Sequence, residues 1–401
     1  MAEITVDDSV LAQILAKCNP PHTPRLKDRE HVRTRPAMYV GDTGMGGLHN
    51  LFFEILNSAI NQALAGRATE IHVWMHENNS ISVQDNGIGI PEQMGNGDEI
   101  SSIDLIMTKL NMSSIPNHDH YKVGWGLHGV GLACVNFLSA WFEAVVERNG
   151  KTYKMHYEKG IASGPPQIIE ATSGHGTTIT WQPDPEIFGE NKFRADIIRR
   201  NIQGMCYLTP ETTIHFHDSL NQNAPEIFHS EHSVGDLVQS LDEYQECIGG
   251  IVHSREVRED IMVDFALQFT ALPATRVLTF ANNVHTSNGG THFKGFQSGL
   301  RRAISSYTGQ LGDVDGDPRY FTYDDVSQGV VAAVSIRHLH PRFEGSTRSI
   351  LGNEEVEGVV DVVVREAIGK FSAEYPEVGR RIVERAANQQ RKRRLGRTTK
   401  I

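Results

Sequence analysis

The chain has 401 residues, of which 39% are hydrophobic and 22% are charged, and this is typical of two or three globular domains. The composition excludes a disordered chain, a collagen and a small disulfide-rich protein, and no run of about 18 apolar residues predicts a membrane span. The net charge of −11 argues against a protein that binds nucleic acid over its whole surface. Four scattered cysteines without a CxxC pair are typical of a reducing, cytoplasmic location.

The pattern of apolar residues predicts an alternation of helices and strands after an acidic, Pro-containing arm over residues 1–25. The first half predicts, in chain order, a helix over 48–65, strands over 70–75 and 80–85, a short helix over 132–138, and strands over 141–148, 152–157 and 177–181. A polar, irregular stretch over 221–233 is typical of a domain boundary. The second half predicts strands over 261–270 and 275–280, a helix over 291–307, a strand over 329–336, and helices over 354–375 and 376–394.

The predicted helix over 48–65 carries a polar face opposite its apolar stripe. At about 100° per residue, Asn50, Glu54, Ser58 and Asn61 lie on this one face. A single Glu among neutral side chains suits a general base flanked by groups that orient water or a metal ion. The alternative is a polar face that only meets solvent.

A buried carboxylate is predicted at the end of the strand over 80–85. Asp85 has the same parity as Ile81 and Val83, so its side chain points toward the apolar side of the strand. There it needs a partner or a raised pKa, and it could accept a hydrogen bond from the amino group of a ligand. The alternative is an Asp that caps the turn at Asn86-Gly87.

Two loops have residues suited to binding phosphate. The glycines over 126–131 allow backbone N–H groups to approach phosphate oxygens, although their spacing matches neither the dinucleotide fingerprint nor the P-loop. Arg348, between a strand and a helix, could clamp a phosphate, or it could be an ordinary surface arginine.

Two further features leave alternatives open. Three histidine pairs each place two imidazoles on one strand face, but no third ligand joins them by spacing, so metal binding is not predicted there: His118/His120, His215/His217 and His338/His340. The basic residues over 391–400 favour a solvated helix end, with a DNA-contacting tail as the alternative.

The order of these motifs resembles that of the GHKL ATPases: Glu on a helix, then Asp-x-Gly-x-Gly, then Gly-x-x-Gly-x-Gly. From about residue 26 to 394 the chain resembles the ATPase region of gyrase B and topoisomerase IV, through the stretches at 33–42, 47–49, 63–66, 121–123, 126–131, 282–292 and 351–353. The resemblance implies an α/β fold. A Bergerat ATP-binding sandwich is expected over 26–220, followed by a transducer domain over 221–401 with a ribosomal-protein-like βαβ core and a basic C-terminal helix.

The resemblance also implies a role for each matching residue. Glu54 matches the general base, and Arg348 matches the cation that reaches the γ-phosphate. Asp85 matches the residue that hydrogen-bonds the adenine amino group, and Thr177 matches a residue that supports this adenine pocket. The remaining nucleotide-binding positions are Gly89, Ile90, Gly126, Leu127, His128, Gly129, Val130 and Gly131. ATP and Mg²⁺ are the implied cofactors, with the metal at Ser58. ATP binding is expected to close a homodimer, with the arm over 1–25 crossing to the partner.

Several positions depart from the family pattern. Asn50 and Ser58 replace a His and the magnesium-binding Asn, Asn61-Gln62 replaces an Asp-Glu pair, and Ser346 replaces a Gln. These changes predict firm nucleotide binding with slow Mg²⁺-dependent hydrolysis. The alternative is a stand-alone relative of another class: an ATP-using enzyme acting on a small molecule, a decoy for a gyrase inhibitor, or a nucleotide-gated binding module. No segment typical of a DNA-cleavage domain is expected, and DNA stays open as a partner.

Overall fold

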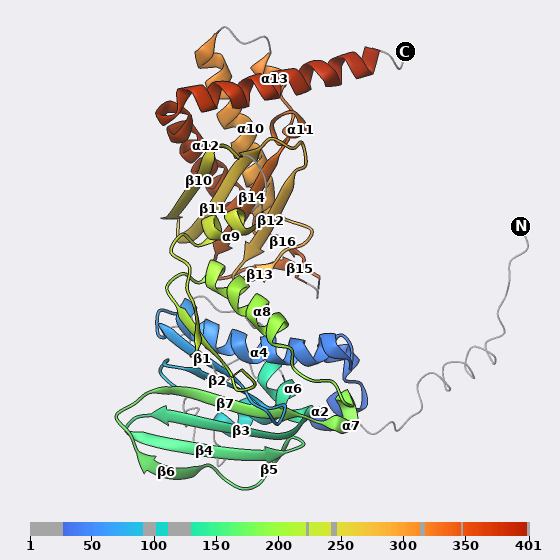
Figure 1. Cartoon of the computed structure of the whole chain (residues 1–401), viewed down its shortest axis with the longest axis vertical. Coiled ribbons are helices and arrows are strands. Elements are labelled where there is room, and N and C mark those ends of the chain that lie inside the picture. Colours follow the sequence, from blue (N-terminus) through green and yellow to red (C-terminus); the bar gives the residue numbers. More distant parts are fainter. Residues whose placement is uncertain are drawn as a thin grey trace, which may run out of the picture.

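The computed structural model describes residues 27–90, 102–110, 130–221, 224–241, 247–312, 317–345 and 348–398. The expected arm over 1–25 lies outside these residues. The first half forms a nine-stranded sheet in the order β5-β4-β3-β7-β2-β1-β8-β9, with β6 paired to β4 (Figure 1). Only β1 and β8 pair in parallel among the described strands of this sheet. The strands are β1 Glu70–Met75, β2 Ile81–Asp85, β3 Ser139–Arg148, β4 Lys151–Glu158, β5 Ile161–Ala162, β6 Gln167–Ala171, β7 Gly176–Pro183, β8 Thr213–Asp218 and β9 Glu226–Phe228.

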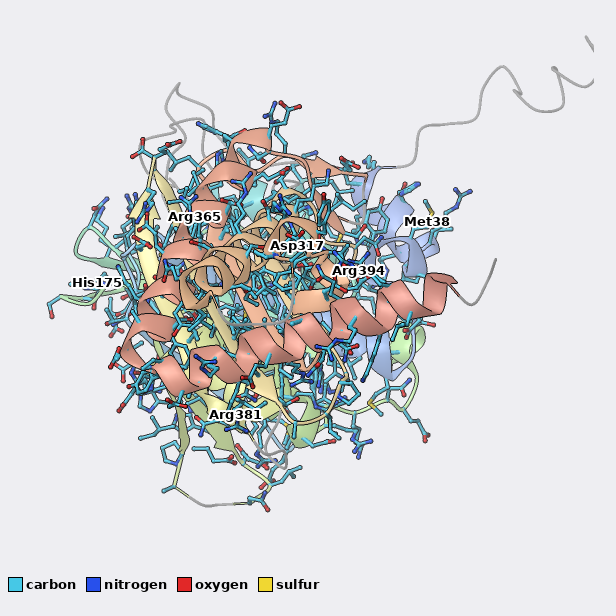
Figure 2. The ribbon with its side chains drawn as sticks, turned by 90° about the horizontal axis from the view of Figure 1, so that it is seen from above. Met38, His175, Asp317, Arg365, Arg381 and Arg394 are labelled. Carbon is cyan, nitrogen blue, oxygen red and sulfur yellow. The ribbon has the colours of Figure 1, made fainter. Side chains whose placement is uncertain are left out.

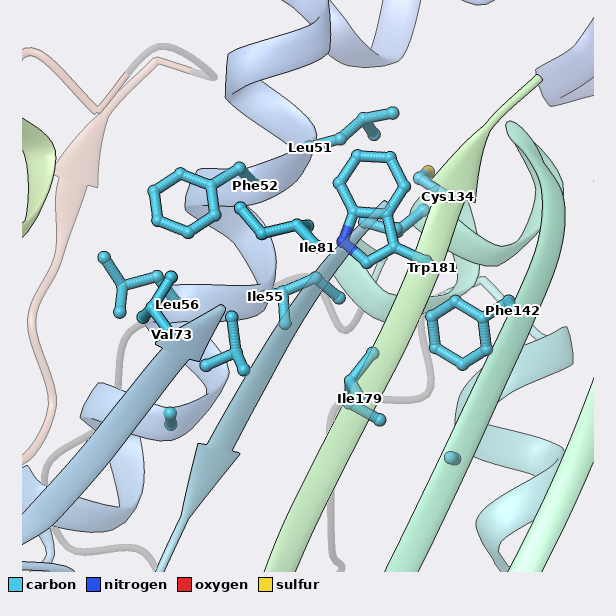
Figure 3. Close-up of a cluster of buried hydrophobic side chains, with 14 of the residues drawn as sticks. Leu51, Phe52, Ile55, Leu56, Val73, Ile81, Cys134, Phe142, Ile179 and Trp181 are labelled. Carbon is cyan, nitrogen blue, oxygen red and sulfur yellow. The ribbon is translucent and has the colours of Figure 1, made fainter. Parts of the chain in front are cut away.

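Helices cover one face of this sheet. They are α2 Asp28–Thr34, α3 Ala37–Val40, α4 Met45–Leu64, α5 Ser102–Thr108, α6 Gly131–Phe137, α7 Pro185–Phe188 and α8 Ala195–Leu208. Figure 3 shows the apolar stripe of α4, including Leu51 and Ile55, against Ile81 and Trp181 of the strands, and all four side chains are fully buried. Each such side chain contributes about 1.5–3 kcal/mol to folding, so this contact fixes α4, and with it Glu54, on the sheet.

The second half forms a five-stranded sheet in the order β10-β11-β14-β12-β13. Its strands are β10 Cys247–Arg258, β11 Ile261–Thr270, β12 Arg276–Ala281, β13 Val284–His285 and β14 Val330–Arg337, with the small pair β15 Phe343–Glu344 and β16 Ile350–Leu351. Its helices are α9 Val234–Leu241, α10 Thr291–Leu311, α11 Tyr323–Val326, α12 Glu354–Glu374 and α13 Pro376–Thr398. Because β12 and β14 are parallel and α10 lies between them in the chain, this half contains the expected βαβ unit.

The two faces of this second sheet pack against different helices. Helices α10, α12 and α13 bury the side that carries Phe265 and Val334, and α9 buries the side that carries Ala266 and Ala333. Figure 1 shows α13 crossing the end of the molecule farthest from the first sheet, and Figure 2 views this helix from above, with Arg381 and Arg394 along it.

The basic C-terminal helix uses part of its charge inside the fold. Arg393 forms an ion pair of 2.7 Å with the buried Asp325, and Arg385 donates hydrogen bonds to the backbone carbonyls of Thr270, the last residue of β11, and of Leu272. Arg394 lies over the ring of Tyr320, 5.7 Å from its centroid. These contacts hold α13 against α11 and the strand ends, so at least three of its guanidinium groups have a structural role.

Hydrogen bonds to the C-terminal end of α8 connect the two halves of the chain. Arg337, at the end of β14, donates 2.9 Å to the carbonyl of Leu208 and forms an ion pair of 3.2 Å with Glu211. The hydroxyl of Ser233, just before α9, donates 2.9 Å to the carbonyl of Tyr207. Leu208 itself is buried in the small core beneath α9. In the part of the chain that the structure describes, no helix has the length and apolar character needed to cross a membrane.

Candidate nucleotide site

Glu54 lies half-buried on α4 and faces the start of α6. A Cβ atom at Gly131 would overlap Oε2 of Glu54, so the glycine permits this close approach. Burial raises the pKa of Glu54 above its ordinary value, and the charge of Arg348 acts in the opposite direction. Desolvation therefore makes this carboxylate a better proton acceptor than an exposed one.

Asp85 is buried at the end of β2, as its parity predicts, with 7% of its surface exposed. Burial raises its pKa to about 7, although hydrogen bonds from the backbone N–H groups of Gly87 and Thr177 stabilise the carboxylate. The Gly87 bond measures 2.8 Å. Thr177 lies directly opposite Asp85 on β7. The structure thus brings these two predicted residues together, and the carboxylate keeps acceptor capacity for a ligand.

The turn after Asp85 is held by two residues that the sequence reasoning missed. The guanidinium of Arg148 donates to the carbonyls of Ile88 at 3.1 Å and Gly89 at 2.7 Å. Nδ1 of His175 donates 2.8 Å to the carbonyl of Gly87. Neither residue lies near the motif in sequence, so only the pairing of β3 and β7 beside β2 reveals them.

The turn requires a glycine at position 89 because its backbone there has a positive φ. Its φ is +72°, and a Cβ atom there would lie 2.7 Å from the carbonyl oxygen of Glu147. Ile90 follows it, half-buried, and packs against the core of the first domain. Both predicted residues thus lie on the turn that leaves Asp85.

Arg348 reaches the first domain from the β15–β16 loop of the second. The loop is fixed by two backbone hydrogen bonds, from Asn288 N–H to the Ser349 carbonyl at 3.0 Å and from Leu351 N–H to the Gly289 carbonyl at 3.1 Å. Arg348 is half-buried, and burial lowers its pKa below the ordinary value, while the charge of Glu54 acts in the opposite direction. The charges of Arg348 and Glu54 therefore interact across the two domains.

The structure describes some of the remaining residues predicted for the nucleotide site and not others. Ser58 is half-buried one turn after Glu54 on α4, and its neighbour Asn57 is 2% exposed with no hydrogen-bond partner for either amide atom among the described residues. Val130 precedes α6 and Gly131 begins it. Gly126, Leu127, His128 and Gly129 lie outside the described residues. Asn50 donates 2.9 Å to the carbonyl of Val40, which ties α4 to α3.

Three kinds of comparison identify the relatives of this chain. Residues 45–187 match the family described as histidine kinase-, DNA gyrase B-, and HSP90-like ATPase, and residues 217–400 match DNA gyrase B. The chain is 34% identical to the DNA gyrase B protein of Thermotoga maritima over 90% of its length and 36% identical to that of Myxococcus xanthus over 90%. It spans 58% and 44% of the length of these two relatives.

Solved structures give the same result. The structure is similar to the 43K ATPase domain of Thermus thermophilus gyrase B in complex with an aminocoumarin, with a TM-score of 0.77 and 32% identity over 94% of this chain and 98% of the other. The topoisomerase IV ATP-binding domain of Francisella tularensis, in complex with a small-molecule inhibitor, also gives a TM-score of 0.77, at 25% identity over 91% of this chain and 97% of the other. The expected Bergerat sandwich followed by a transducer domain is confirmed. The chain belongs to the gyrase B family of GHKL ATPases, of which it contains the ATPase and transducer regions.

Proposed function

We propose that the chain binds ATP between α4, the β2 end and the start of α6, and hydrolyses it slowly as an ATP-gated homodimeric clamp. The observation that supports this most is the convergence of Glu54, Gly131 and Arg348, which belong to three separate segments and two domains. An acid with a raised pKa, a glycine that opens space beside it, and a cation that stabilises charge form a set suited to phosphoryl transfer to water.

The two ends of the site match the length of a nucleoside triphosphate. A Cβ atom at Gly87 would lie 2.9 Å from the side chain of Gln62, so the turn after Asp85 packs on α4 eight residues beyond Glu54. Eight residues of helix span about 12 Å. In the proposed complex Asp85 accepts a hydrogen bond from the adenine amino group, with Thr177 beside it, and Glu54 takes the proton of the attacking water.

The phosphates are assigned to the segment over 126–131 together with Gly89 and Ile90, and the γ-phosphate to Arg348. Ser58 fits Mg²⁺ in the chemistry of its donor, because a half-buried hydroxyl on the face of Glu54 is a hard oxygen ligand. The ion would supply charge neutralisation on the phosphates. We place the two domains at 26–220 and 221–401, and the arm over 1–25 against the partner protomer.

Steady-state ATP turnover with Mg²⁺ tests the hydrolytic role. Glu54→Gln is expected to lower kcat by about 10²–10⁴-fold with little change in ATP affinity, because it removes the base and leaves the pocket. Ser58→Asn restores the ligand that the family uses and is expected to raise kcat. Equal turnover in the Glu54→Gln variant and the wild type would contradict the assignment.

Two further measurements test the clamp. ATP turnover with added DNA shows whether the clamp responds to DNA, and light scattering with a non-hydrolysable ATP analogue tests whether the dimer closes.

A second candidate function is ATP binding without topoisomerase work, as a gated binding module, an inhibitor decoy or an enzyme with another substrate. The favouring observation is the loss of charge along α4, where Asn57, Ser58, Asn61 and Gln62 are all neutral. Micromolar ATP affinity with no turnover in any condition would support the binding module. Turnover that appears only with an added small molecule would support another substrate. Tight aminocoumarin binding, without micromolar ATP affinity and without turnover on an added small molecule, would support the decoy.

A further inference from the structure

Five side chains of the first sheet gather on the face that turns away from α4. Exposure alternates along β1, so that Glu70, His72 and Trp74 share this outer face. Strand β8 runs parallel to β1, with His215 opposite His72 and His217 opposite Trp74. The sequence showed the second histidine pair but no third ligand. Strand β1, which is distant from His215 in the chain, brings Glu70 and His72 beside it as further candidate ligands.

The distances within this group suit a small cation. Oε1 of Glu70 lies 3.4 Å from Nε2 of His72 and 2.9 Å from Nε2 of His215. Ligand atoms about 2.1 Å from a tetrahedral ion are about 3.4 Å apart, so these two separations need only small adjustments. The two imidazole rings are stacked, 4.5 Å apart and inclined by 12°, so both rings must turn about their side-chain torsions to direct their nitrogens to one ion. Within the described ranges, these three residues are the one group of three or more such side chains whose ligand atoms all lie within 4.8 Å.

A neighbouring imidazole can hold His72 in the tautomer that binds an ion. Nδ1 of His72 lies 3.3 Å from Nε2 of His217, which can accept its hydrogen when Nε2 of His72 binds an ion. A protonated His72 paired with Glu70 at 3.4 Å is the other use of these atoms.

The site is accessible and anchored. The His72 and His215 side chains are 29% and 18% exposed and that of Glu70 is 47% exposed, which leaves room for a water molecule as fourth ligand. The backbone N–H of Glu70 donates 3.1 Å to Oδ1 of Asn86, so the carboxylate is attached to a fixed point of the strand.

We propose that Glu70, His72 and His215 bind one divalent transition-metal ion of the Zn²⁺ type, with His217 as the positioning residue for His72. Two imidazoles and a carboxylate form a ligand set that Zn²⁺ prefers, with one position open to water. The ion would connect β1 to β8 on the side of the sheet opposite Glu54. It is thus a different site from the proposed Mg²⁺ at Ser58, which has hard oxygen ligands.

The test uses the purified full chain with Cys18→Ser and Cys247→Ser in every sample, because an exposed thiol such as Cys247 also binds such ions. Calorimetric titration with Zn²⁺ is expected to show one tight site per chain, and Co²⁺ is expected to give the visible absorption of tetrahedral coordination. His72→Gln and His215→Gln should each weaken binding at least 100-fold and remove the rise in Tm that Zn²⁺ causes. His156→Gln is the matched control, because His156 also lies on this sheet 3.6 Å from a carboxylate, that of Glu143.

Positioning by His217 has its own readout. His217→Phe should weaken Zn²⁺ binding about 10- to 100-fold and alter the Co²⁺ spectrum, and His217→Gln, which keeps an acceptor atom, should restore both. The absence of a tight Zn²⁺ site in the wild-type chain would overturn the proposal. Unchanged affinity in the His72→Gln/His215→Gln double variant would also overturn it, because the ion would then bind elsewhere.

Discussion

Asp85 makes the first domain less stable as the pH rises, and Asp85→Asn is expected to remove that loss. Burial raises the pKa of this carboxyl from 3.8 to about 7 in the folded chain. Between these values the unfolded chain has released the proton that the folded chain still holds. The folded state therefore binds more protons, and its stability falls with rising pH until about pH 7, where the loss is complete.

The size of the effect follows from the shift. Each pKa unit corresponds to about 1.36 kcal/mol, so the two units between about pH 5 and about pH 7 amount to about 2.7 kcal/mol. A domain of about 200 residues changes its Tm by about 2–4 °C per kcal/mol. The Tm of Asp85→Asn minus that of the wild type should therefore grow by about 5–11 °C between pH 5 and pH 8. All other titrating groups occur in both proteins and cancel.

Scanning calorimetry without nucleotide, across this pH range, measures the difference directly. Asp196→Asn is the control, since Asp196 is exposed and a hydrogen bond from Arg194 lowers its pKa, which confines its effect to more acidic solutions. A difference between Asp85→Asn and the wild type that stays constant across the range would refute the reasoning, because Asp85 would then be ionised throughout. The same variant should weaken ATP binding at least tenfold. The buried carboxyl of Asp85 would then increase the affinity for ATP while it lowers the free energy of unfolding at neutral pH.

Two further substitutions test close approaches at glycines. Gly131→Ala should leave the Tm almost unchanged but lower kcat about 10²-fold in the ATPase assay. The reason is that the new Cβ displaces the flexible end of the Glu54 side chain by about 1 Å. Turnover equal to that of the wild type would contradict this contact. Gly295→Ala should destabilise the second domain by about 1–3 kcal/mol in urea unfolding, since its Cβ would lie 2.9 Å from Val360 on α12. Gly309→Ala, on the same helix with nothing within 4 Å, should instead stabilise it by about 0.5–1 kcal/mol.

Local patterns predicted much of the fold. The apolar period of α4 and the alternation in β1 and β2 gave their positions to within three residues, because one face of each element is buried. Strands β6 and β10 were not predicted. All five residues of β6 are exposed, and β10 contains Gly249 and Gly250 and lies at a sheet edge with little burial, so neither has an alternating apolar pattern.

The site was predictable where its residues form motifs and not where the fold alone joins them. Glu54 and Asp85 were predicted from helical and strand periodicity, and Arg348 from its place on a loop between a strand and a helix. Arg148 was missed because its contact with the turn after Asp85 depends on strand order. The pairing of His72 with His215 was missed for the same reason, since register between parallel strands has no local signal.

The strand order of the second sheet has a consequence for folding during synthesis. Strand β14 lies between β11 and β12, yet it is made after both of them. Until residue 337 has left the ribosome, the β10–β11 hairpin and the β12–β13 hairpin have no strand to join them, and each exposes an unpaired edge. Completion of this sheet is therefore delayed until its last strand is made, and until then the segment between residues 247 and 337 exposes strand edges that can pair wrongly.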